Sequence, residues 1–171
     1  MKHLKDANIF KKQVVLERND YLKDYQSIDT NVYFVESGSL RIFTIDEGEE
    51  RNIRFGYSNN IIVSLDSFIS EHPSDFIMQA IKKTTLSVAS KADFMNFIHS
   101  SHEYLVWYQE VLEDLVLQQI EREKDLLTNS PKVRYERVLK RSPQLFQEIP
   151  NKHIANYLRM TPETLSRLKK S

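Results

Sequence analysis

The hydrophobic and polar positions follow one pattern in the first part of the chain, from about residue 9 to residue 98. Short runs rich in β-branched and aromatic residues recur there, at 32–35, 40–45, 51–55, 61–63 and 84–88. Runs of this kind are typical of antiparallel strands in a sandwich or barrel. Glycine-containing turns at 36–39 and 46–49 predict a hairpin between 40–45 and 51–55. Because the chain has only three glycines, the candidates for further left-handed positions are Asn19, Asn31, Asn59 and Asn60.

The pattern changes between Glu103 and Leu127, where the chain contains neither glycine nor proline. This segment predicts one helix of roughly 37 Å, at about 1.5 Å per residue. The first half is apolar on nearly all sides, so it has to be covered on more than one side. The strand domain can cover one side, and the same helix of a second copy is the simplest cover for another. We therefore expect a homodimer through the stripe of Leu105, Tyr108, Leu112 and Leu115.

Short helices are predicted for the last part of the chain. Ser130 can cap a helix that begins at Pro131 and runs over 131–141, and Thr161 can cap another that begins at Pro162. The apolar positions of the closing segment are Ile154, Ala155, Leu158, Met160, Leu165 and Leu168. This is the spacing of a helix-turn-helix, whose second helix enters the DNA major groove. The other interpretation is a helical hairpin that only packs.

The formal net charge is zero, with 24 basic and 24 acidic residues, but the charge is unevenly distributed. Residues 130–171 hold ten lysines and arginines and three acidic residues, which favours a polyanionic partner such as double-stranded DNA. Arginine can bond guanine through two hydrogen bonds, glutamate can accept from cytosine, and serine or threonine can contact bases or phosphates. The candidate DNA-binding residues are Lys152, Thr161, Glu163, Thr164, Ser166, Arg167, Lys169 and Lys170.

The composition excludes several other classes of protein. The chain has no cysteine, so disulfides, cysteine-ligated metal sites and a thiol nucleophile are ruled out. No apolar run approaches the roughly 20 residues needed to span a bilayer, and the first residues are too polar for a secretory signal. We expect a cytoplasmic α+β protein without a membrane partner. Its expected parts are a strand domain (1–100), a long helix with hinge (101–129) and a helix-turn-helix domain (130–171).

This order of parts resembles the Crp/Fnr regulators, the family of the cyclic-AMP receptor protein, over nearly the whole chain. Residues 32–43, 79–90 and 154–168 carry the resemblance, and 161–167 is similar to regulators from the Bacteroidetes branch. The resemblance implies an N-terminal antiparallel β-roll of the cyclic-nucleotide-binding type, a dimer on the long helix and a winged helix-turn-helix for a two-fold symmetric operator. It also implies base contacts from Glu163 and Arg167, and RNA polymerase as a candidate partner.

The chain departs from the family pattern at the turn before the last helix. Arg159 stands where the family usually has glycine, so we expect a looser turn. Pro162 replaces an arginine that contacts bases in some members, so the operator need not be theirs.

The effector region departs further. Members that bind cyclic nucleotide hold the ribose and phosphate with Gly-Glu and Arg-Ser/Thr pairs, but residues 57–79 contain no glycine, arginine or lysine. Asp75 stands within the expected Arg-Ser/Thr position, where a carboxylate would repel phosphate. We therefore expect no binding of cyclic AMP, and no cofactor, since haem would depend on the lone His72. An unidentified small molecule, or none, is expected at Ser64, Asp66, Ser67 and Ser74, which otherwise only cap turns.

Two other functions stay open. A cupin-like metalloenzyme would need histidines that converge on one metal, whereas those of this chain are scattered, at His3, His72, His99, His102 and His153. No glycine-rich phosphate loop or nucleophile elbow occurs, so we do not expect an enzyme. The other alternative keeps the fold but acts through protein contacts alone. Salt-dependent DNA binding would separate that alternative from a regulator.

Overall fold

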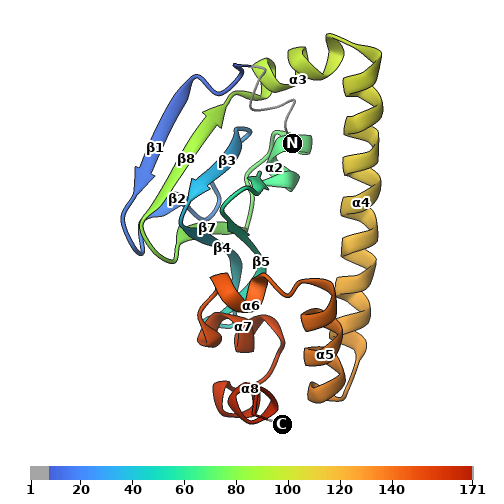
Figure 1. Cartoon of the computed structure of the whole chain (residues 1–171). Coiled ribbons are helices and arrows are strands. Elements are labelled where there is room, and N and C mark those ends of the chain that lie inside the picture. The colour runs from blue at the N-terminus through green and yellow to red at the C-terminus, as the bar shows by residue number, and fades with distance from the viewer. Residues whose placement is uncertain (1–7, 171) are drawn as a thin grey trace. The chain divides into compact units, whose positions relative to one another are not determined.

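The computed structural model describes residues 8–170, and it divides into two compact units (Figure 1). The first comprises Met1–Trp107 and the second Tyr108–Ser171, so the boundary lies within the long helix α4 (His102–Leu127). Helix α4 covers the segment that the sequence predicts as one unbroken helix, which confirms that prediction.

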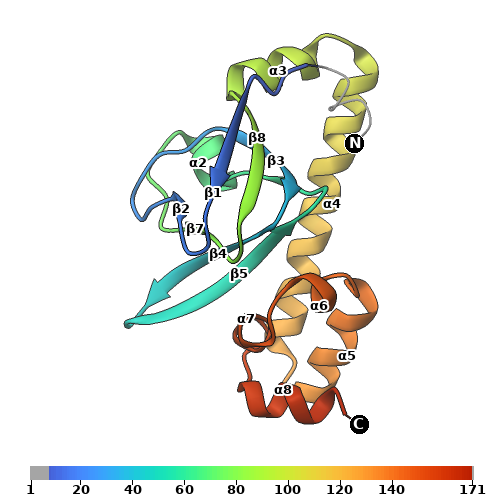
Figure 2. The ribbon, with the colours of Figure 1, turned by 60° about the vertical axis from the view of Figure 1, so that its left-hand side comes forward.

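The strands of the first unit form two four-stranded antiparallel sheets, whose arrangement can be followed in Figure 2. One sheet has the order β1 (Lys12–Leu16), β8 (Thr84–Ala89), β3 (Val32–Ser37) and β6 (Ile61–Ile62). The other has the order β2 (Tyr21–Lys23), β7 (Ile77–Ala80), β4 (Ser39–Asp46) and β5 (Glu49–Tyr57). Strands β4 and β5 pair from Ser39↔Tyr57 to Asp46↔Glu49, as the predicted hairpin requires. The N-terminal antiparallel strand domain is thus confirmed.

The core of this unit is made of side chains from both sheets. Val35 and Leu86 from one sheet and Leu40 and Met78 from the other are completely buried and belong to one hydrophobic cluster. Burial of an aliphatic side chain of this size stabilises a fold by about 1.5–3 kcal/mol. Strands β3, β4 and β7 have runs of four or five consecutive buried residues, so both faces of these strands are covered.

Two helices interrupt the strand pattern of the first unit, and the sequence prediction of strands up to residue 98 is wrong there. Helix α2 (Leu65–Ser70) follows β6, and helix α3 (Lys91–His99) follows β8. The Ser90 hydroxyl accepts from the backbone N–H of Asp93 (3.0 Å) and donates to the Asp93 carboxylate (2.8 Å). This side-chain cap starts α3, and the Ser-x-x-Asp spacing is the sequence signal that predicts it.

The second unit contains four helices after α4, at α5 (Pro131–Arg141), α6 (Leu145–Glu148), α7 (Asn151–Tyr157) and α8 (Pro162–Leu168). The predicted N-caps are confirmed, because Ser130 Oγ accepts from the N–H of Val133 (3.4 Å) and Thr161 Oγ1 from that of Thr164 (3.2 Å). The short helix α6 is not evident from the sequence pattern. The buried core of the unit is Val138, Leu145, Ile149, Ile154, Ala155, Leu158 and Leu165.

The turns of the first unit place residues in the left-handed region. Gly38 (φ +93°) and Gly48 (φ +81°) do so, as do Asn19 (φ 72°) and Asn59 (φ 69°). The two other predicted asparagines, Asn31 and Asn60, do not. At Gly38 a Cβ atom would lie 2.4 Å from the carbonyl oxygen of Lys83, whereas at Gly48 it would meet nothing within 4 Å.

Replacement of these two glycines by alanine should therefore have unequal effects. We expect Gly38→Ala to lower the free energy of unfolding by roughly 2–4 kcal/mol, from left-handed strain plus overpacking. We expect Gly48→Ala to lower it by only about 1 kcal/mol, from the strain alone. Urea unfolding of the two variants measures the difference, and equal losses would contradict the close approach at Gly38.

Candidate nucleic-acid interface and effector region

Helices α7 and α8 lie against each other (Figure 2). Ala155 and Leu158 on the side of α7 and Leu165 on α8 are completely buried. The connection between the helices is closed by backbone hydrogen bonds, from Leu158 N to Ile154 O (2.8 Å) and from Met160 N to Ala155 O (3.0 Å). The helix pair thus has a buried inner side and leaves the opposite side of α8 exposed.

The predicted DNA-binding residues lie on the exposed side, with one exception. Thr164 is half-buried, and the exposed ones are Lys152, Thr161, Glu163, Ser166, Arg167, Lys169 and Lys170. Lys169 donates from Nζ to the side-chain oxygen of Asn151 at the start of α7 (2.6 Å). The candidates between positions 163 and 167 lie within α8, Thr161 caps this helix, and Lys169 and Lys170 follow it. Lys152 lies in the first turn of α7.

Glu163 is an ionised hydrogen-bond acceptor on this surface. Its own backbone N–H and the Thr161 hydroxyl donate to it, and with the charge of Arg167 they hold the pKa of Glu163 below its usual range. Glu163 is also the only acidic residue between positions 149 and 171. The exposed side of α8 therefore offers one carboxylate among several cations, a set of groups that can contact base edges and phosphates.

Arg159 occupies the turn between the helices in the left-handed conformation, with φ 53°. The expectation of a looser turn is not met, because the N–H of Arg159 donates to Asn156 O (3.1 Å) and its carbonyl is bound as well. The side chain of Arg159 is exposed. The arginine thus adopts the backbone conformation that glycine would adopt at lower cost.

Two buried arginines donate hydrogen bonds to the backbone of this turn. Arg134 of α5 donates from Nε to Leu158 O (2.9 Å) and from Nη2 to Arg159 O (3.0 Å). Arg122 of α4 donates from Nη2 to Tyr157 O (2.7 Å) and lies over the Tyr157 ring, 3.7 Å from its centre. Burial lowers the pKa of Arg122. Three successive carbonyls, which the end of a helix leaves without helical partners, are satisfied in this way.

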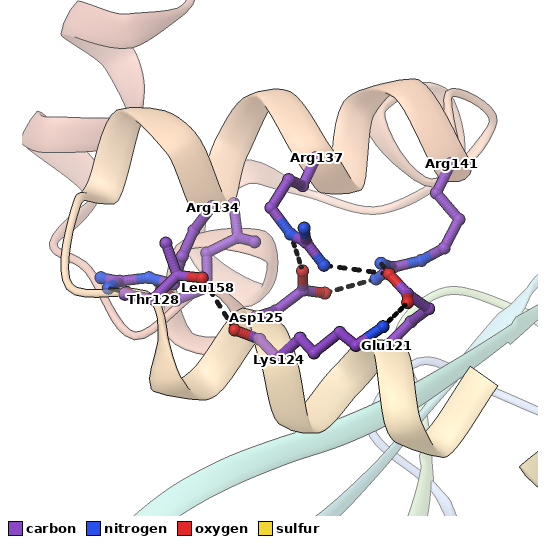
Figure 3. A network of polar contacts seen from close by, with 8 residues as sticks. All are labelled: Glu121, Lys124, Asp125, Thr128, Arg134, Arg137, Arg141 and Leu158. Carbon is purple, nitrogen blue, oxygen red and sulfur yellow. Dashed lines mark hydrogen bonds and ion pairs between the residues drawn. The ribbon is translucent and has the colours of Figure 1, made fainter. Parts of the chain in front are cut away.

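A further carboxylate–arginine network connects α4 to α5 (Figure 3). Asp125 of α4 is completely buried and accepts from Arg137 Nε (3.0 Å) and from Arg141 Nη2. Arg137 also donates to Glu121 (2.9 Å), and Glu121 accepts from Lys124 (2.7 Å). The bond from Lys124 and the charges of the two arginines lower the pKa of Glu121.

This network corrects the charge argument from the sequence. Arg134, Arg137 and Arg141 count among the ten basic residues of the last segment, but all three bind groups within the protein. The cations available to a polyanion are consequently those of α7, the turn and α8, together with Lys132 and Lys140 of α5. The signal that sequence reasoning missed is the Glu121–Asp125 pair, which is spaced by four residues and therefore presents both carboxylates on one helix face.

The proposed effector residues bond to the chain itself. Ser64, Ser67 and Ser74 are almost completely buried, and the Ser67 hydroxyl donates to His72 O (2.8 Å) while it accepts from the N–H of Asp29 (3.1 Å). The Ser74 hydroxyl accepts from the N–H of Phe76 (3.1 Å). These contacts are those of residues that stabilise turns.

Asp66 lies among these serines in the first turn of α2. Burial would raise the pKa of Asp66, but hydrogen bonds from Ser74, from the backbone N–H of Ser67 and from Ser64 outweigh it and lower that pKa. The Ser64 hydroxyl lies 3.0 Å from the carboxylate of Asp66. A carboxylate that stays ionised at this place adds to the electrostatic barrier for a phosphate.

A lysine from a distant strand also reaches this region. Lys23 of β2 is 3 % exposed, and its ammonium donates to the carbonyls of Phe76 (2.6 Å), Ser74 (3.1 Å) and Asp24 (3.1 Å). Burial lowers the pKa of Lys23, and the charges of Asp66 and other nearby aspartates oppose this shift. The cation that sequence reasoning did not find in residues 57–79 is thus supplied by β2, where it binds backbone carbonyls.

The predicted dimer stripe on α4 is only partly exposed in a single chain. Leu105 is 40 % exposed, whereas Tyr108, Leu112 and Leu115 are half-buried. More exposed apolar side chains lie further along the helix, at Val116, Leu117, Ile120, Leu126 and Leu127. At 3.6 residues per turn, Leu105, Val116 and Ile120 share a side of the helix, and Leu112 borders it.

The structure offers no support for a metal centre within residues 8–170. No group of three or more histidine, cysteine, aspartate or glutamate side chains in that range could hold a metal ion. His99 ends α3 and His102 begins α4, so the pair does not lie on one helix face. His3 lies outside the described residues. Over the same range, no helix combines the length and apolarity needed to cross a membrane.

The family model that matches the chain is the cyclic nucleotide-binding domain, over residues 13–101, which is more than half of the sequence. No curated protein matches. The chain belongs to the cyclic nucleotide-binding domain family, and with the solved structures described next this confirms the resemblance to the Crp/Fnr regulators.

Several solved structures share the fold. FixK2 from Bradyrhizobium japonicum has a TM-score of 0.76 at 14 % identity, with 93 % of this chain and 82 % of that chain covered. A CooA variant from Carboxydothermus hydrogenoformans has a TM-score of 0.72 at 18 % identity, with 93 % and 74 % covered. The Catabolite Activator Protein of Thermus thermophilus has a TM-score of 0.60 at 19 % identity, with 99 % and 81 % covered. These similarities establish the fold.

Proposed function

We propose that this protein is a DNA-binding transcription regulator in which α7 and α8 form a helix-turn-helix. The observation that carries the proposal is the division of α8 into a buried side, with Leu165, and an exposed side with Glu163, Ser166 and Arg167. A helix held by its apolar side and capped at Thr161 can enter the major groove with its N-terminal residues leading. The shared fold with the Catabolite Activator Protein supports the same conclusion.

The residues of the exposed side have distinct roles in this proposal. Arg167 donates to the O6 and N7 atoms of guanine, and Glu163 accepts from the N4 amino group of cytosine. Lys152, Lys169 and Lys170 contact phosphates and supply affinity without sequence preference. Thr161, Thr164 and Ser166 contribute shorter polar contacts around them.

Arg167→Ala should therefore reduce discrimination between operator sequences. We expect a loss of roughly 1–3 kcal/mol for the correct base pair over the others, because one bidentate contact is removed. Fluorescence anisotropy with duplexes that differ at single positions measures this loss. Lys170→Ala is the control, and it should weaken all duplexes about equally and reduce the salt slope by about 1.

Two results would count against this assignment. One is an unchanged order of preference among duplexes in the Arg167→Ala variant. The other is a wild-type protein that binds no duplex even at low ionic strength, where electrostatic binding is strongest. The second result would favour the alternative of a protein that acts through protein contacts alone.

We further propose that the regulator is a homodimer through α4. The exposed apolar residues Leu105, Val116 and Ile120 lie on one side of this helix, and a second copy of the helix offers the same residues. A two-fold dimer presents two copies of α8 to half-sites whose centres are about 34–36 Å apart, one turn of DNA.

Val116→Glu should convert the dimer to a monomer and weaken operator binding. Val116 is 60 % exposed in the single chain, so the charge leaves the fold of the monomer intact. Leu112→Glu should have the same effect on association, but Leu112 is half-buried and its replacement also strains the monomer. Sedimentation at micromolar concentration measures the change, with Gln118→Glu on another side of α4 as the control. A monomeric wild type would disprove the proposal.

We also propose that the strand domain takes no cyclic nucleotide. Ser64, Ser67 and Ser74 are engaged with the chain, and Asp66 and Asp75 would repel a cyclic phosphate. The ammonium of Lys23 is already bound by three carbonyls.

Cyclic AMP at millimolar concentration should therefore leave thermal unfolding unchanged. A ligand present at 100 times its Kd would stabilise the folded protein by about 2.7 kcal/mol, so the assay detects even weak binding. Cyclic GMP tests whether the base matters. A raised unfolding temperature with either nucleotide would contradict the proposal.

A further inference from the structure

The turn between α7 and α8 contains a backbone conformation that its residue does not favour. Arg159 has φ 53°, in the region where a side chain crowds the following carbonyl and glycine is preferred. A non-glycine residue stays in this region only where its surroundings hold it there. The residues that hold the turn therefore also determine the orientation of α8.

Arg134 makes the contacts that can hold it. Arg134 is 8 % exposed, and its guanidinium binds Leu158 O (2.9 Å) and Arg159 O (3.0 Å), the carbonyls on either side of Arg159 Cα. The same group binds Thr128 O and Asn129 O, in the three-residue connection between α4 and α5. Figure 3 labels Thr128 and Leu158 beside Arg134. One planar cation thus joins the end of α4 to the turn that precedes α8.

We propose that Arg134 is a positioning residue for α8, which offsets the cost of the left-handed Arg159 and so fixes the direction in which α8 meets DNA. The inference rests on the proposed DNA-binding function. Arg134 itself does not contact DNA in this proposal, since its donors are directed to four carbonyls within the protein. A lysine could not replace it, because an ammonium lacks the rigid fork that reaches both the α4–α5 connection and the turn.

The central variants are Arg134→Lys, alone and combined with a change at Arg159. Arg159→Gly and Arg159→Gln both remove the charge of Arg159, but only glycine removes the cost of the left-handed conformation. We expect Arg134→Lys to weaken specific duplex binding about tenfold or more, comparable to the loss of one bidentate base contact. Binding to non-specific duplex should change by less than about twofold, because the phosphate-contacting lysines stay in place.

The rescue experiment distinguishes positioning from a general loss of structure. Arg159→Gly in the Arg134→Lys background should recover most of the specific affinity, whereas Arg159→Gln in that background should recover none. Arg137→Lys is the matched control on α5, since Arg137 binds Asp125 and not the turn. It should leave the ratio of specific to non-specific binding unchanged.

Amide hydrogen exchange provides a readout that does not depend on DNA. In Arg134→Lys the amides of Arg159 and Met160, which close the turn, should exchange faster, and Arg159→Gly should slow them again. If the wild type binds no duplex but exchange follows this pattern, the proposed function fails and the role of Arg134 in the turn stands. Unchanged specific binding and unchanged exchange in Arg134→Lys would overturn the inference. An equal recovery with Arg159→Gln would overturn it as well.

Discussion

The second unit depends on the pairing of buried charge at the end of α4. Asp125 is completely buried, and an ionised carboxylate tolerates such burial only when cations and hydrogen bonds compensate it. Arg137 and Arg141 do so from α5, and Arg134 of the same helix binds the turn before α8. Loss of one member of a buried pair costs about 3–5 kcal/mol, a large fraction of the stability of a small domain. The ion pairs of Asp125 thus hold α5 at the end of α4, and the separate contacts of Arg134 hold the turn before α8.

The sequence predicted the parts of this architecture that depend on local chemistry. Ser130 with Pro131 and Thr161 with Pro162 are cap signals that act within one helical turn, and both helices begin there. The strand runs and the long helix followed from hydrophobic periodicity. The strand pattern of the first unit does not predict helix α3, although Ser90 and Asp93 carry a capping signal for it.

The sequence pattern does not show which charged side chains bind groups that are distant in the sequence. Arg134, Arg137 and Arg141 add to the basic charge of residues 130–171, and only the structure shows that Asp125 and backbone carbonyls bind them. Residues 57–79 contain no lysine or arginine. The cation that lies near Ser74 is Lys23, which precedes Ser74 by 51 positions. No local sequence pattern predicts a hydrogen bond between residues so far apart.

In both units a buried cation donates hydrogen bonds to the carbonyls of a loop. A loop whose carbonyls are buried must find donors for them, and this chain has few glycines with which to shape its loops differently. Lys23 binds the carbonyls of Ser74 and Phe76, and Arg134 those of Leu158 and Arg159. In each case a buried cation fixes a loop through hydrogen bonds to its carbonyls, so these loops are held by the protein itself. A loop held in this way takes its shape from contacts within the chain and does not depend on a ligand for its order.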